Sequence, residues 1–123
     1  MLKMVPEVAV EAQNLKEVEE MSRSESIQVR VKAAESSEAT EEILLRLAED
    51  KNFQVRWCVA SNLNASAVVL EKLAKDTVWR VRMTVACHRN VTKKILMKLV
   101  NDPAHQVLLK VAQMNLLNPR RAG

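Results

Sequence analysis

A repeat of 26 residues constrains the fold of this chain more than any other feature of its sequence. Aspartates recur at Asp50, Asp76 and Asp102, and the apolar residues around them recur in step. After each aspartate the same register holds a valine and then a valine-alanine pair, at Val55 and Val59-Ala60, Val81 and Val85-Ala86, and Val107 and Val111-Ala112. A fixed period of this size indicates stacked supersecondary units. A unit this short cannot bury its own apolar faces, so its stability must come from its neighbours.

The composition favours helices as the elements of each unit. The 123-residue chain is 48% hydrophobic and 28% charged, with two tryptophans, one phenylalanine and one glycine, Gly123. Strand-rich folds favour aromatic residues and need glycine in many tight turns. The scarcity of glycine also excludes functions that depend on a glycine-rich phosphate loop, a dinucleotide-binding turn or a nucleophile elbow. We therefore expect an all-α fold.

One register of the repeat predicts where helices begin. Residues of the preferred N-cap types occupy it in every copy: Asn14, Thr40, Ser66, Thr92 and Asn118. Proline is favoured at the first helical position, and it follows both Asn118 and Asp102, so Pro103 predicts the start of a second helix in its unit. Each unit is therefore expected to hold two short helices, at about 41–49 and 51–61 in the second copy.

These helix starts divide a single domain into four units. The units are residues 14–39, 40–65, 66–91 and 92–117, with 1–13 as an N-terminal cap and 118–123 as a C-terminal tail that begins a truncated fifth unit. The expected architecture is an α-solenoid of four 26-residue repeats, each a pair of helices.

An arginine in the second helix of each unit has to find a partner. At 100° per residue Arg56 points between two apolar flanks of its helix, where an unpaired charge is costly. If each aspartate bonded the arginine of its own unit, Arg30 and Asp102 would be left alone. If each aspartate instead bonds the arginine of the preceding unit, every one of these arginines and aspartates has a partner. We therefore expect a ladder between units: Arg30 with Asp50, Arg56 with Asp76, and Arg82 with Asp102.

These residues resemble the leucine-rich repeat variant family and, more distantly, HEAT-like repeats. The shared pattern is an L-x-x-L-A-x-D segment, four spacer residues and V-R-x-x-V-A. It reads Leu44, Leu47-Ala48, Asp50, Val55-Arg56 and Val59-Ala60, then Leu70, Leu73-Ala74, Asp76, Val81-Arg82 and Val85-Ala86. The copy from Leu96 to Ala112 departs from the pattern at Val100 and Leu108. The resemblance covers residues 14–117.

The resemblance implies a right-handed superhelix of short helices that acts by presenting a surface. Some members of the variant family hold an iron-sulfur centre on an N-terminal cysteine cluster, but no cysteine precedes Cys58 here, so no cofactor is expected. HEAT-like DNA glycosylases place an acid near an aromatic residue in a polar cleft. Asp76 and Trp79 are close in sequence, but we assign both structural roles. We expect a non-enzymatic scaffold that binds another macromolecule.

The polar side of the second helices is the expected binding surface. Positions 54, 58 and 61 lie within about 60° of one another on a helix, so stacked units would join them into a strip. The strip reads Gln28, Lys32, Glu35, Gln54, Cys58, Ser61, Arg80, Thr84, Cys87, Gln106, Lys110 and Gln113. Second helices usually line the concave side of a solenoid, which favours a protein partner there. The alternative is an ordinary solvated face.

Charge is distributed unevenly along the chain. Residues 1–50 carry 6 basic and 12 acidic side chains, whereas residues 51–123 carry 13 and 3. A basic patch is expected from Arg89, Lys93, Lys94, Lys98, Arg120 and Arg121. Such a patch could bind nucleic acid, which is the alternative function, although aromatic residues that stack on bases are scarce.

Opposite charge at the two ends equally favours head-to-tail association of copies into a homo-oligomer. This association would cover apolar residues at the ends of the stack: Met4, Val5, Val8, Met114, Leu116 and Leu117.

Two cysteines and a histidine do not form a convincing chemical site. Cys58, Cys87 and His88 lack a fourth ligand and the spacing of a zinc site, so no metal is expected. Cys87 and His88 are neighbours that point about 100° apart on a helix, which disfavours a nucleophile-base pair. Both cysteines are expected to be reduced thiols. We expect His105, Trp57 and Trp79 to serve in packing.

Nothing in the sequence indicates contact with a membrane. No apolar run approaches the roughly 18 residues of a membrane span, and the first residues contain acids where a signal peptide has an apolar stretch. We therefore expect a cytoplasmic protein.

Overall fold

The computed structural model describes residues 14–117, and all the regular elements in that range are helices. They are α2 (Leu15–Met21), α3 (Ile27–Glu35), α4 (Glu41–Leu47), α5 (Phe53–Ser61), α6 (Ala67–Leu73), α7 (Trp79–Cys87), α8 (Lys93–Leu99) and α9 (His105–Leu117). The all-α prediction is therefore confirmed for the part of the chain that the structure describes. The expected cap at 1–13 and tail at 118–123, including the N-cap at Asn118, lie outside this part.

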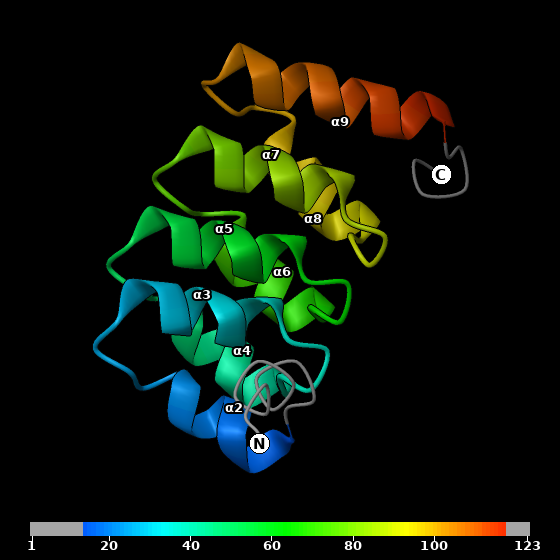
Figure 1. Cartoon of the computed structure of the whole chain (residues 1–123). Helices are drawn as coiled ribbons and strands as arrows, with labels where there is room; N and C mark the ends of the chain where they lie inside the picture. The colour runs from blue at the N-terminus through cyan, green and yellow to red at the C-terminus, as the bar shows by residue number, and fades with distance from the viewer. Residues whose placement is uncertain (1–13, 118–123) are drawn as a thin grey trace, which may run out of the picture.

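The helices lie in two rows (Figure 1). One row holds α3, α5, α7 and α9, and each of these contacts the next member of the row. The other row holds α2, α4, α6 and α8. Helix pairs follow one another along one direction, from α2 and α3 at one end to α8 and α9 at the other (Figure 1). Each inner pair therefore lies between two others, and the pair at either end of the described residues contacts one neighbour (Figure 1).

The first helix of each pair begins where the sequence predicts. The side chains of Thr40, Ser66 and Thr92 each accept a hydrogen bond from the backbone N–H three residues later. Asn14 does the same, and the Glu17 carboxylate accepts from the Asn14 N–H to complete a capping box. These bonds satisfy N–H groups that have no partner within the helix. The caps therefore set where each pair starts.

The second helices begin later than predicted. The helix expected at 51–61 begins at Phe53, because the residue before it is the N-cap. The last helix begins at His105 and not at Pro103. The Asp102 carboxylate accepts a hydrogen bond from the Ala104 N–H and also binds an arginine, so it holds the turn before the helix and does not cap a helix at Pro103.

A continuous apolar core runs through the described helices. The first helix of each pair supplies the largest buried side chains, at equivalent positions: Ile43, Leu44, Leu47, Val69, Leu70, Leu73, Ile95, Leu96 and Leu99. The second helices add smaller buried side chains: Ala34, Val55, Val59, Ala60, Val81, Val85 and Ala86. Alanine allows neighbouring helices to approach closely, since its side chain is one methyl group. The buried residues form one cluster that is not divided between pairs.

An arginine-aspartate pair links successive helix pairs. Arg56 Nε lies 2.7 Å from Asp76 Oδ2, and Arg56 Nη2 lies 3.3 Å from Oδ1. The same bidentate geometry, with an Nε–Oδ2 distance of 2.7 Å, holds in the two other pairs, Arg30 with Asp50 and Arg82 with Asp102. The structure thus brings together all six residues of the expected ladder, each arginine meeting the aspartate that follows it by 20 positions.

The main chain makes this ladder continuous. Arg56 Nη1 donates to the Asp50 carbonyl at 2.9 Å, and Arg82 Nη1 donates to the Asp76 carbonyl at 2.7 Å. Each of these arginines therefore binds the carbonyl of one ladder aspartate and the carboxylate of the next. The guanidinium donors and the carboxylate acceptors are satisfied together, which a partly buried ion pair requires.

The ladder also changes the acidity of its last carboxyl group. Burial by itself raises the pKa of Asp102. The hydrogen bond from Arg82, the hydrogen bond from the Ala104 N–H and the charge of Arg82 outweigh burial, so the pKa of Asp102 lies below its ordinary value. The hydrogen bond to Asp102 likewise raises the pKa of Arg82. The pair is therefore ionised at neutral pH.

A second set of polar contacts lies at the turns between one helix pair and the next. The Asn62 side-chain amide donates to Ala34 O at 2.8 Å and to Ser36 O at 3.0 Å. One pair further on, His88 Nε2 lies 2.6 Å from Asn62 O, and His88 Nδ1 accepts from the Asn90 N–H at 2.9 Å. Because Nδ1 is an acceptor, we assign the ring hydrogen to Nε2, which donates it to Asn62.

Some residues expected to be buried are exposed. Trp57 was expected in the core, yet it is 42% exposed, because its indole covers the junction of α5 and α7 from outside, bonded to Thr84. Trp79 is half-buried, as packing requires. His105 and Ala112 are exposed because, among the described residues, α9 has no following helix to cover it.

Candidate functional site

The expected binding strip lies on the row that contains α5, α7 and α9. Its members at one register, Gln54, Arg80 and Gln106, are exposed. Those at a second register, Cys58, Thr84 and Lys110, are half-buried, and Cys87 is exposed. Because these helices lie side by side (Figure 1), equivalent positions give one continuous face. We call this face the second-helix strip.

Trp57 stands beside the strip in a fixed orientation. Its ring is stacked on Phe53, with ring centroids 5.9 Å apart and planes 6° apart. Its indole N–H donates to Thr84 Oγ1 at 3.0 Å, and the Thr84 hydroxyl donates in turn to Arg80 O at 2.8 Å. The indole is therefore held from two sides while 42% of its surface remains exposed.

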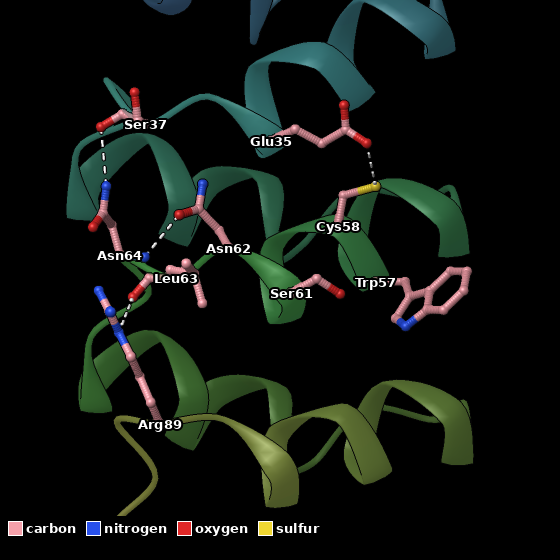
Figure 2. Close-up of a pocket in the computed structure, with 9 residues that line it drawn as sticks. All are labelled: Glu35, Ser37, Trp57, Cys58, Ser61, Asn62, Leu63, Asn64 and Arg89. Carbon is pink, nitrogen blue, oxygen red and sulfur yellow. Dashed lines mark hydrogen bonds between the residues drawn. The ribbon is translucent and has the colours of Figure 1, made fainter.

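A hollow of about 520 Å³ opens beside Trp57 (Figure 2). Residues of three successive helix pairs line it: Glu35, Ser37, Trp57, Cys58, Ser61, Asn62, Leu63, Asn64 and Arg89. In Figure 2 the Trp57 and Arg89 side chains lie toward opposite ends, with Ser61 and Leu63 between them. The Leu63 side chain is 61% exposed, although it is large and apolar. The hollow therefore combines apolar surface with charged groups at its rim.

The two cysteines of the strip are poor nucleophiles. Cys58 Sγ lies 3.8 Å from Glu35 Oε2, and burial, followed by the charge and hydrogen bond of Glu35, raises the pKa of Cys58 to about 11. Burial also raises the pKa of Cys87, against a smaller opposing effect of Lys110. Both thiols are free and mainly protonated at neutral pH, whereas the thiolate is the form that attacks or binds a metal. These side chains suit a binding surface better than covalent chemistry.

His88 lies apart from this chemistry. The side chain is buried, and both of its ring nitrogens have backbone partners in the turn between helix pairs. Within residues 14–117, no three side chains of His, Cys, Asp or Glu are grouped so that they could hold a metal ion. The structure therefore gives His88 a structural role.

The expected basic patch is divided between two places. Arg89 follows α7 and lines the hollow. Lys98 and Lys94 extend from α8 to Glu71 on α6, at 2.8 and 3.5 Å. The hydrogen bond from Lys98 and the charges of both lysines lower the pKa of Glu71. The remaining members are Lys93, the first residue of α8, and Arg120 and Arg121, which lie outside the described residues.

Sequence reasoning missed two asparagines in the turns at the edge of the hollow. Asn64 Nδ2 donates to Ser37 O, and Asn90 Nδ2 donates to Ala65 O, both at 3.0 Å. The signal that could have found them is the repeat itself, since Asn64 and Asn90 lie 26 residues apart. The turns at the edge of the hollow are thus tied to the preceding helix pair.

Comparison with known proteins adds no assignment to this site. No family model matches the chain, and no curated protein or solved structure matches it. None of the helices in residues 14–117 combines the length and the apolar character needed to cross a bilayer.

Proposed function

We propose that the chain is a right-handed α-solenoid of four repeats, 14–39, 40–65, 66–91 and 92–117, of the kind found in the leucine-rich repeat variant family. The recurrence of the same caps, the same buried positions and the same arginine-aspartate contacts at a spacing of 26 residues supports it. Such a molecule works by presenting a long surface.

The proposed activity is that of a cytoplasmic, non-enzymatic scaffold that binds another protein through the second-helix strip. The observation that carries this proposal is Trp57, which is 42% exposed and yet held by Phe53 and Thr84. Rigid exposed aromatic side chains serve as anchors in protein interfaces, because they bury a large area with little loss of conformational entropy.

Site-specific photo-crosslinking tests this proposal. A photoreactive amino acid is placed at Gln54 or Gln106 on the strip and, as a control, at Val68, which is exposed on α6 in the other row. We expect proteins of the source cell to be captured from the two strip positions and not from Val68. Equal capture from all three positions, or capture from none, would contradict the proposal.

A second candidate function is nucleic-acid binding by the basic C-terminal half. The 13 basic and 3 acidic side chains of residues 51–123 favour it, whereas the pairing of Lys94 and Lys98 with Glu71 opposes it. Titration with an arbitrary duplex over a salt series is the test, because phosphate contacts weaken steeply as salt rises. Absence of binding at low salt removes this candidate.

Copies of the chain are also proposed to associate end to end. On the last described pair Leu109 is 52% exposed and Val100 is 39% exposed. Sedimentation velocity over a concentration series, with Leu109→Glu as the variant, tests whether this end is covered. Of the end residues expected from the sequence, Met114 is half-buried, and the side chains of Met4, Val5, Val8, Leu116 and Leu117 lie outside what the structure describes.

A further inference from the structure

We propose that the hollow beside Trp57 binds a short extended peptide in which an apolar side chain and a carboxylate lie at least three residues apart. This inference rests on the proposed protein-binding function and specifies the chemistry of the partner segment. It depends on an apolar end, a charged end and the distance between them.

The apolar end is formed by Trp57, and Leu63 continues the apolar surface toward Arg89 (Figure 2). Both line the hollow, and they are 42% and 61% exposed. The indole N–H already has its acceptor in Thr84, so a partner that covers the ring leaves no buried donor without a bond. Stacking on Phe53 fixes the ring plane before any partner arrives. An apolar side chain of the partner can therefore pack here at low cost in polar desolvation and side-chain entropy.

The charged end is formed by Arg89. Its Nε donates to Leu63 O at 3.3 Å, which holds the guanidinium beside the hollow. A guanidinium is a planar fork of five N–H donors, and it recognises carboxylates in particular.

The charges along the row favour the same partner. Basic side chains predominate on the strip, from Lys32, Arg80 and Lys110. The carboxylate at the hollow is Glu35, and it accepts a bond from the Cys58 thiol. An acidic segment is therefore favoured over a basic one.

The distance between the two ends sets the spacing of the recognised residues. Trp57 and Ser61 lie one turn apart on α5, which is about 6 Å along the helix axis. Leu63 and Arg89 lie just beyond the end of that helix (Figure 2). An extended chain advances about 3.3 Å per residue, so two residues reach only as far as Ser61, and at least three are needed to reach from the indole to the guanidinium.

A peptide fits these observations better than a polynucleotide does. Binding of a single strand requires successive aromatic platforms together with cations that follow the backbone. In the hollow, Trp57 is the aromatic side chain, and Arg89 is the basic one. The nearest arginine on α5, Arg56, is bound to Asp76. The test must therefore also be able to detect binding of a polynucleotide.

Selection from a phage-displayed library of random dodecapeptides, with the full chain immobilised, tests the proposal. We expect enriched peptides to share an apolar residue with Asp or Glu at one fixed separation of at least three positions. Synthetic copies of them should bind at least tenfold more weakly to Trp57→Ser and to Arg89→Glu. Val68→Ser is the matched control, because Val68 is 53% exposed on the other row, and it should leave the Kd within twofold.

A further variant guards against loss of folding. Trp57→Ser removes contacts to Phe53 and Thr84, whereas Leu63→Glu alters a side chain that is 61% exposed and also adds a repelling carboxylate. The same tenfold loss is expected for Leu63→Glu, with an unchanged circular dichroism spectrum.

Several outcomes would overturn the proposal. They are enriched peptides without acidic residues, undiminished binding to Leu63→Glu and Arg89→Glu, no enrichment at all, or tight binding of a labelled oligothymidylate that these variants abolish. Crosslinking from Gln54 and Gln106 reports on the strip independently. The failure of this inference is therefore distinguishable from failure of the proposed function.

Discussion

At the scale of single residues, the ladder aspartates do more than balance charge. The Asp76 carboxylate accepts two bonds from Arg56 and one from the Val78 N–H, and its carbonyl accepts from Arg82. Val78 is the N-cap of α7 and provides no side-chain cap, and the bond from its N–H to Asp76 holds this turn as the bond from the Asn52 N–H to Asp50 does before α5. One side chain therefore both joins two helix pairs and shapes the entry to a helix.

Replacing Asp76 with alanine should cost about 2–4 kcal/mol of unfolding free energy, since it leaves the mostly buried Arg56 without its carboxylate. Urea denaturation measures this loss. The double variant Asp76→Ala with Arg56→Leu is the control and should be more stable than the single variant, because leucine is the residue that the chain itself carries in this register at Leu108. A loss below about 0.5 kcal/mol, as for an exposed ion pair, would show that Arg56 is solvated.

The lowered pKa of Asp102 predicts an acid-labile contribution to stability. In the unfolded chain this carboxyl titrates near 3.9, whereas in the folded chain it titrates below its ordinary value. The unfolded state therefore binds more protons as the pH falls through this range. The contribution is complete above about pH 5 and is lost as the pH falls through the folded pKa.

Urea midpoints measured from pH 6 to pH 3 should fall more steeply for the natural chain than for Asp102→Asn, which cannot titrate at this position. Parallel curves for the two proteins would mean that Asp102 gains no stability from its ionised form.

The raised pKa of Cys58 predicts slow alkylation. At pH 8 an alkylating reagent should modify Cys58 at least tenfold more slowly in the folded chain than in the urea-unfolded chain, because the thiolate is the reactive form. Glu35→Gln should increase the rate, since it removes the charge that helps to raise this pKa. Mass spectrometry of the Cys58 peptide measures both rates. Equal rates in the folded and the unfolded chain would be inconsistent with this environment.

At the scale of elements, the turns between helix pairs are as specifically bonded as the helices. Asn62 and His88 occupy one register, and each contacts the helix pair that precedes it. Asn64 and Asn90 do the same two residues later. Side chains of different types therefore fill equivalent structural positions, which makes exchange between repeats a useful experiment.

His88→Asn should be tolerated, with a change in unfolding free energy below about 1 kcal/mol, because asparagine already serves at Asn62. His88→Ala should cost about 1–3 kcal/mol, since it leaves the Asn62 carbonyl and the Asn90 N–H without their side-chain partner. Thermal and urea unfolding of the two variants provide the comparison. Equal losses for both would mean that the shape of His88, and not its hydrogen bonds, is what matters.

Helix starts were predictable from sequence where the cause is local. Thr40, Ser66 and Thr92 cap helices through bonds within three residues, so their register alone indicates where α4, α6 and α8 begin. The exposure of Trp57 was not predictable in this way. It depends on how closely α5 and α7 approach, which is set by tertiary packing.

The candidate site likewise combines a feature that was predictable from local sequence with one that depends on tertiary packing. The strip was predicted from equivalent helical positions, but the hollow was not. Its lining combines several registers of the repeat: Glu35 and Ser61 share one, Ser37, Leu63 and Arg89 share another, and Trp57 belongs to a third. A periodic pattern identifies residues that share a register, and it does not show which different registers meet in space.

At the scale of the whole molecule, stability is passed from one helix pair to the next. The core is one cluster, and the arginine-aspartate contacts cross all three junctions between the four described helix pairs. A single helix pair cannot bury its leucine and valine side chains without its neighbours. We therefore infer that the helix pairs are interchangeable units of one stack, each stabilised by its neighbours.

Removal of residues 66–91 tests this claim most directly. The deletion joins Ala65 to Thr92 in register and places Arg56 opposite Asp102. We predict a helical protein that unfolds cooperatively at a lower urea midpoint, and a double-mutant cycle of Arg56→Leu and Asp102→Ala that gives a coupling of about 0.5–3 kcal/mol. A shortened chain without a cooperative transition, or a folded one in which Arg56 and Asp102 are uncoupled, would contradict the account.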